Sequence, residues 1–158
     1  ALLEEERRSL ALPASMHIDE QLAGAYVRKA ESAPDRAQTY YEKALEIFNS
    51  LYAQGYSTRQ MAENIAILYQ QTGDLASAET ALLRMTEDFP EDYRAYKRLA
   101  FLEADKQQRK ENRERDYRQM KAYYDKAKEL YEAYGQVADT EMNMLDSMMK
   151  ELREGNWL

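Results

Sequence analysis

The chain has no cysteine and a single histidine, His17, among its 158 residues. Without cysteine there can be no disulfide framework, thiolate nucleophile or cysteine metal ligand. One imidazole also leaves little material for histidine-based catalysis or zinc binding. We therefore expect no enzymatic activity from this chain, no cofactor and no metal site. His17 lies beside Asp19 and Glu20, a pattern typical of the start of a helix.

Glycine and proline are also scarce, with 5 and 3 residues, whereas tyrosine occurs 13 times and 32% of residues are charged. This composition predicts a helical protein with few tight turns. No apolar run approaches the roughly 18 residues that span a bilayer, and the mean hydropathy is −0.83. The formal charge of −7 argues against binding to nucleic acid backbones, which requires a surplus of Lys and Arg. We expect a soluble chain without membrane insertion or a nucleic acid partner. The absence of cysteine suits the cytoplasm, which is the expected location, but also permits export.

Three segments share a pattern in which a large residue lies between two smaller ones or methionines, with gaps of four and three. They are Ala37/Tyr41/Ala44, Ala78/Leu82/Met85 and Met120/Tyr124/Ala127. Corresponding members are 41 and then 42 residues apart. Upstream of each triplet is a second pattern with i, i+1, i+4 spacing, which lines one helix face. It consists of Leu22/Ala23/Tyr26, Ile65/Ala66/Tyr69 and Leu99/Ala100/Glu103. Each of the three units is therefore predicted to be a pair of helices.

Turn-forming residues separate these helices, with Pro34 in the first unit, Gly73 in the second and Pro90 between the second and third. Ser57 is followed three residues later by Gln60, which matches a capping box. We expect a helix to begin there with Ser57 as its cap.

The second unit resembles the tetratricopeptide repeat (TPR) family, whose helix pairs repeat about every 34 residues. The residues that carry the resemblance are Ile65, Ala66, Tyr69, Gly73, Asp74, Ala78, Leu82, Met85 and Pro90. The resemblance implies an all-α, right-handed superhelix of three helix pairs with a C-terminal capping helix. HEAT-like repeats of about 40 to 47 residues are the alternative, because the observed period falls in their range. We favour TPR because the extra length has two different origins. Unit one runs long at its end, and unit three has an insertion near residues 106–115.

These patterns divide the chain into five predicted segments: a leader or helix remnant (1–12), repeat 1 (13–56), repeat 2 (57–91), repeat 3 with its insertion (92–135), and a capping helix with a tail (136–158). A solenoid needs such a cap because its last repeat would otherwise expose an apolar face. One apolar face, an acidic cap and a final glycine define the capping helix. The residues are Met142, Leu145, Met149 and Leu152, with Asp139 as the N-cap and Gly155 as a left-handed stop.

Tyrosines and a basic run call for separate interpretations. Four tyrosines occupy repeat positions expected to be buried, and four others lie near turns, where they are expected to be accessible. The first group is Tyr26, Tyr41, Tyr69 and Tyr124, and the second is Tyr56, Tyr93, Tyr117 and Tyr134.

The run from Lys106 to Arg118 holds six basic and three acidic residues. It is interpreted as a solvated loop, with a contact surface as the alternative.

The TPR resemblance also implies where a partner peptide would bind, since helix A of each repeat faces the groove. Some TPR proteins recognise the acidic C-terminal peptides of chaperones with a clamp of basic and Asn side chains. Asn64, Arg94 and Arg98 match clamp positions, and the two arginines are i, i+4 neighbours that can reach one carboxylate. The first repeat departs from this pattern, because it has Glu20 and Gly24 there. The predicted groove set is Asn64, Ile67, Gln71, Arg94, Lys97, Arg98 and Phe101.

We therefore predict a non-catalytic interaction module that binds a protein, peptide or helix in its groove. An acidic peptide is one candidate partner, and the alternative is that these charges only keep helix A soluble. Two alternatives remain open. Self-association through the same surfaces is one. The other follows from residues 143–158, which also resemble the C-terminal tail of bacterial serine/threonine protein kinases with TPR regions. No Gly-rich loop or other kinase motif occurs in this chain, so any kinase activity would belong to a portion outside it.

Overall fold

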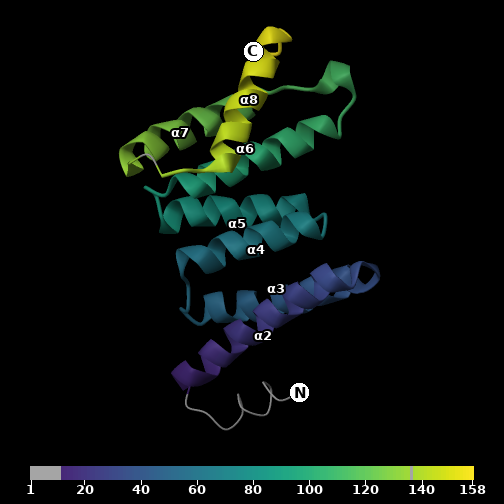
Figure 1. Cartoon of the computed structure of the whole chain (residues 1–158), viewed down its shortest axis with the longest axis vertical. Coiled ribbons are helices and arrows are strands. Elements are labelled where there is room, and N and C mark those ends of the chain that lie inside the picture. Colours follow the sequence, from purple (N-terminus) through teal and green to yellow (C-terminus); the bar gives the residue numbers. More distant parts are fainter. Residues whose placement is uncertain (1–11, 136) are drawn as a thin grey trace. The chain divides into compact units, whose positions relative to one another are not determined.

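The computed structural model describes residues 12–135 and 137–158, and within these ranges every regular element is a helix. The elements in order are α2 (Leu12–Ser32), the short 3-10 helix η1 (Pro34–Arg36), α3 (Ala37–Ala53), α4 (Arg59–Gln71), α5 (Leu75–Asp88), α6 (Tyr93–Gln108), the 3-10 helix η2 (Asn112–Glu114), α7 (Arg118–Tyr134) and α8 (Thr140–Glu154) (Figure 1). The all-α prediction is confirmed. The expected leader lies outside the described residues, except for Leu12.

The chain forms two compact units, the first ending at Asp74 and the second beginning at Leu75. The first unit holds α2, α3 and α4, and the second holds α5 to α8. The boundary falls within the predicted second repeat, between α4 and α5.

In the first unit, α2 packs along α3, and α3 in turn contacts α4. Small residues allow the close approach of α2 and α3, since Ala23 and Ala44 are both fully buried. Two polar contacts reinforce the unit. The Asn49 side-chain amide donates to the hydroxyl of Tyr69 over 2.9 Å, and the hydroxyl of Tyr56 donates to Glu20 over 2.7 Å.

The start of α4 differs by one residue from the prediction. Thr58, with extended backbone, caps the helix, and its Oγ1 accepts a hydrogen bond from the amide of Met61. The prediction of Ser57 as the cap was therefore wrong. Both residues carry a hydroxyl, so the sequence pattern could not distinguish which of them is the last extended residue before the helix.

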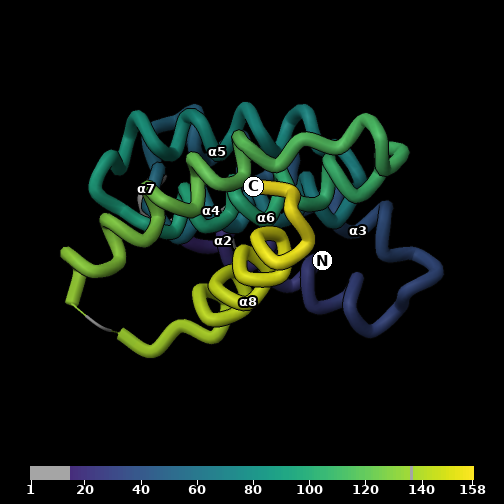
Figure 2. The backbone as a smooth tube through the Cα atoms, turned by 90° about the horizontal axis from the view of Figure 1, so that it is seen from above, coloured from purple at the N-terminus to yellow at the C-terminus, as the bar shows by residue number. Residues whose placement is uncertain are grey.

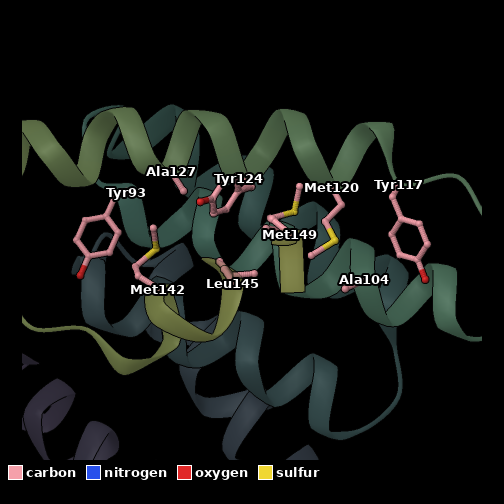
Figure 3. Close-up of a cluster of buried hydrophobic side chains, with 10 residues drawn as sticks. Tyr93, Ala104, Tyr117, Met120, Tyr124, Ala127, Met142, Leu145 and Met149 are labelled. Atoms are coloured by element: carbon pink, nitrogen blue, oxygen red, sulfur yellow. The ribbon is translucent and has the colours of Figure 1, made fainter. Parts of the chain in front are cut away.

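In the second unit, α6 is the central helix and contacts α5, α7 and α8. Figures 1 and 2 show α8 running across α6 rather than alongside it. Its buried face, formed by Met142, Leu145 and Met149, has at most 1% exposure. Figure 3 shows these side chains among residues of α6, α7 and the segment before α7, including Tyr117 and Tyr124. The predicted apolar face of the capping helix is therefore confirmed.

Both ends of α8 can be compared with the prediction. Asp139 caps the helix as expected, because its Oδ1 accepts from the amides of Glu141 and Met142 at 3.0 and 3.2 Å. At the other end Gly155 has φ −84°, so the prediction of a left-handed glycine stop was wrong. Asn156 takes that conformation instead, with φ 63°, and asparagine is among the residues that tolerate it.

The predicted insertion in the third unit contains the last turn of α6 and a loop before α7. Contacts within this segment hold the loop in place. Arg115 donates hydrogen bonds to the carbonyls of Gln108 and Lys110, and Arg118 forms an ion pair with Asp116 at 2.7 Å. Hydrogen bonds from Arg118 lower the pKa of Asp116 to about 2. Much of the basic run is thus paired locally.

The tyrosines follow the prediction in part. Of the four tyrosines expected to be buried, Tyr124 is buried, whereas Tyr26, Tyr41 and Tyr69 are only partly buried, so the prediction was wrong for those three. Tyr93 and Tyr117 are buried, with 2% and 5% exposure, so their predicted accessibility was also wrong. Both belong to the buried cluster against which α8 packs. Their position near a turn in the sequence did not indicate that α8 would cover them. Tyr134 is 53% exposed, as expected.

Candidate interaction site

The candidate site is centred on the basic residues of α6. Arg94, Lys97 and Arg98 follow i, i+3, i+4 spacing, which places them on one face of the helix. Asp92 begins this helix as its cap and accepts from the amide of Arg94 over 3.0 Å. The cap therefore fixes where the basic face starts.

Lys97 is held between two carboxylates from the start of α8. Its Nζ lies 3.1 Å from Asp139 Oδ2 and 3.1 Å from Glu141 Oε1. The Lys97 side chain is 5% exposed, and that of Asp139 is 11% exposed. A cation with so little access to water requires such partners, because an unpaired buried charge is strongly destabilising.

Arg98 makes a two-pronged contact with the second of these carboxylates. Its Nη1 and Nη2 donate to Glu141 Oε2 and Oε1 over 2.6 and 2.9 Å. This parallel geometry is the strongest form of a guanidinium–carboxylate pair. Glu141 thus binds both Lys97 and Arg98.

Arg94 lies against two tyrosine rings. Its guanidinium carbon is 4.9 Å from the ring centre of Tyr93 and 5.1 Å from that of Tyr134. It also pairs with Asp92 at 3.3 Å. Aromatic faces attract a guanidinium electrostatically, so the rings and the carboxylate together fix its position.

Burial and charge pull the pKa values of this cluster in opposite directions. Burial raises the pKa of Asp139, but hydrogen bonds from Tyr93 and Lys97 outweigh it, so the net pKa lies below the ordinary value. Burial likewise raises the pKa of Glu141, and Arg98 followed by Lys97 brings the net value down. Burial and the bond to Asp139 raise the pKa of Tyr93 well above 10.0. Both carboxylates are therefore ionised at neutral pH.

The predicted groove set is divided between the two units. Asn64, Ile67 and Gln71 lie on α4, where Asn64 accepts a hydrogen bond from Gln60 over 3.1 Å. The remaining four residues lie on α6, where Phe101 packs partly buried against the core cluster of the second unit. The structure thus brings Arg94, Lys97, Arg98 and Phe101 onto one helix.

Sequence reasoning missed several partners of the basic face, among them Asp139, Glu141 and Tyr134. Asp139 was assigned only a capping role, and Tyr134 only accessibility. The sequence does contain a signal for this pairing. Two acidic residues lie at the start of a helix with an apolar face, and three cations lie on one face of another helix, so their charges are complementary. The meaning of this signal depends on where α8 docks, which helical periodicity does not give.

A hollow of about 580 Å³ lies beside this cluster, where the turn between α5 and α6 meets the last turns of α7. It is lined by Glu91, Asp92, Leu130, Ala133 and Tyr134. Acidic side chains and the apolar end of α7 therefore border the same space.

Other candidate chemistry can be placed as well. His17 is exposed, and Gln21 contacts its ring nitrogen Nε2 at 3.2 Å. In the described part of the chain, no three His, Asp or Glu side chains are grouped so that they could hold a metal ion. No described helix is both long and apolar enough to cross a membrane.

No protein-family model and no curated protein matches the chain. Among solved structures it is similar to the TPR domain of Sgt2 from Aspergillus fumigatus. That match has a TM-score of 0.59 and 19% sequence identity, and it covers 85% of this chain and 81% of the other. The chain therefore has a TPR-like helical fold, and the TPR resemblance is confirmed at the level of fold. The kinase context stays a prediction.

Proposed function

We propose that this chain is a non-catalytic protein-interaction module that binds a peptide or helix of a partner, with the basic face of α6 as a contact surface. The observation that carries the proposal is the TPR-like fold combined with three cations on one helix face. Helical repeat folds present extended surfaces on which such side chains bind partners.

The contacts within the site assign different parts to the three cations. Lys97 is 5% exposed at its side chain and serves to hold α8. The side chains of Arg94 and Arg98 are 21% and 20% exposed, so each still presents an edge to solvent. An acidic peptide would bind across these edges, competing with Asp92 and Glu141 for their guanidinium groups.

The competition by Glu141 gives a direct test. Replacing Glu141 with Gln removes a negative charge while keeping the size of the side chain, so the affinity for an acidic peptide should rise about three- to tenfold. Fluorescence anisotropy at two salt concentrations measures the binding of a library of capped peptides that end in acidic residues. An Arg94→Ala/Arg98→Ala variant should lose this binding, and salt should weaken it.

A matched control lies at the end of the same helix. Arg109 pairs with Asp105 at 3.1 Å, and its side chain is 59% exposed. Arg109→Ala removes a cation from the C-cap of α6, outside the site, and should leave peptide binding unchanged. Absence of binding to every library member, with circular dichroism confirming folded protein, would contradict the proposal. Sedimentation of the protein alone then tests self-association as the alternative.

A further inference from the structure

The hollow at the end of α7 combines an apolar wall with acidic side chains. Leu130, Ala133 and Tyr134 follow i, i+3, i+4 spacing, so they form one face of the last turns of α7. Glu91 and Asp92 border the same space from the turn that precedes α6. With about 580 Å³, the hollow is within the size range of small-ligand pockets.

The charges around the hollow are unbalanced. The nearby cation Arg94 binds Asp92 at 3.3 Å and stacks on Tyr134, so Asp92 is already compensated. Glu91 is exposed and makes no hydrogen bond or ion pair within the described residues. Glu87, near the end of the preceding helix, is likewise exposed, and its neighbour Asp88 lies 3.9 Å from Arg84. Among the described residues that line the hollow none is cationic, and their net charge is negative.

Tyr134 adds a second feature that favours a cation. Tyr134 is 53% exposed as a residue although Arg94 stacks on its ring, so part of its surface remains available. An aromatic ring next to a carboxylate suits a guanidinium, which stacks on the one and donates hydrogen bonds to the other. The long aliphatic stem of arginine can cover Leu130 and Ala133 while its charged head reaches Glu91.

We infer that this hollow is a docking site for an arginine side chain of a partner peptide, flanked by an apolar residue. The apolar wall, the uncompensated carboxylate of Glu91 and the exposed ring of Tyr134 select that occupant by charge and shape. The inference rests on the proposed function as an interaction module and extends it. The chemistry at this end of α7 is opposite to that at Arg98, so one peptide with an acidic and a basic segment could contact both.

The test uses the whole chain labelled with ¹⁵N and three capped tripeptides, in which leucines flank arginine, citrulline or glutamate. Citrulline has the shape of arginine without its charge. The arginine peptide should shift the backbone amide resonances of the lining residues. The citrulline peptide should bind about three- to tenfold more weakly, as expected for loss of a charge contact near the surface. The glutamate peptide should leave these resonances unmoved.

Variants locate the site. Glu91→Gln should weaken the arginine peptide by the same factor as citrulline, and Ala133→Arg should abolish binding by placing a guanidinium in the hollow. Both positions are exposed, so the fold should tolerate the changes. Glu87→Gln removes a similar charge that does not line the hollow, and it should have no effect.

Equal binding of the arginine and citrulline peptides, or no shift at the lining residues up to millimolar concentration, would overturn the inference. In that event the acidic-peptide library still decides the proposed function separately, because its readout depends on Arg94 and Arg98.

Discussion

Replacing Lys97 with Met should destabilise the second unit by about 2–3 kcal/mol, since the change removes two charge-assisted hydrogen bonds from a nearly dry site. The methionine retains most of the apolar stem, so little packing is lost. The cost stays below that of orphaning a buried charge because the carboxylates keep other partners. Asp139 still accepts from Tyr93 at 2.7 Å, and Glu141 still binds Arg98.

The assay exploits the single tryptophan. Trp157 lies in the second unit, where its ring centre is 5.4 Å from that of Tyr117, so its fluorescence reports on the region around α8. Urea unfolding gives the free-energy difference if the slope with denaturant stays the same in both proteins. Lys121→Met is the matched control. Lys121 makes an exposed i, i+4 pair with Asp125, and its loss should cost at most about 0.5 kcal/mol.

The difference between wild type and Lys97→Met should also depend on pH. Asp139 and Glu141 have folded pKa values below their ordinary values of 3.8 and 4.5. Their contribution is therefore fully present above these ordinary values and is lost as the pH falls through the lower folded values. The free-energy difference should be constant from about pH 6 to 8 and should shrink below about pH 4.5. A Lys97→Met protein within about 0.5 kcal/mol of wild type at pH 7, or a difference that does not change in acid, would refute the reasoning.

Three further predictions concern the second unit. Met149→Ala, at a fully buried position, should cost about 2–4 kcal/mol in urea unfolding, whereas Met144→Ala, at a position 56% exposed, should cost under about 0.5 kcal/mol. Gly135→Ala should lower the stability by about 1 kcal/mol, because Gly135 has φ 96° and the added methyl meets no neighbour that could compensate. Tyr93 and Tyr124 have raised pKa values through burial and bonds to carboxylates. In a titration by absorbance at alkaline pH, two tyrosines should therefore ionise only as the protein unfolds, and stability should fall as the pH rises above about 10.

Local patterns predicted the helices well because their causes are local. The i, i+3, i+7 spacing of Met142, Leu145 and Met149 identified the buried face of α8, and the carboxylate of Asp139 identified its start. The errors at Ser57 and Gly155 are each one residue from the true cap or turn. Ser57 and Thr58 both carry a hydroxyl that can cap a helix, and Gly155 and Asn156 both tolerate the left-handed conformation, so only the backbone distinguishes them.

The charged part of the site depended on an arrangement that the sequence does not specify. Arg94, Lys97 and Arg98 were identified as one helix face, but the pairing of Lys97 and Arg98 with Glu141 links positions more than 40 residues apart. The prediction treated these cations as a surface for a partner, and the structure shows that Lys97 and Arg98 also bind the start of α8. The burial of Tyr93 has the same origin, since α8 and α7 cover it from distant positions in the sequence.

The two sides of α8 differ in how sharply they define its position. Thioethers are flexible and polarisable, so the apolar contacts of Met142 and Met149 define the position of the helix along its axis less sharply than directional hydrogen bonds do. The guanidinium of Arg98 can donate to both oxygens of Glu141 in one alignment only. A displacement by one turn, about 5.4 Å, would break that alignment and leave Lys97 without both carboxylates. The ionic contacts thus fix the position of α8 along its axis, and the apolar contacts supply most of the stabilisation.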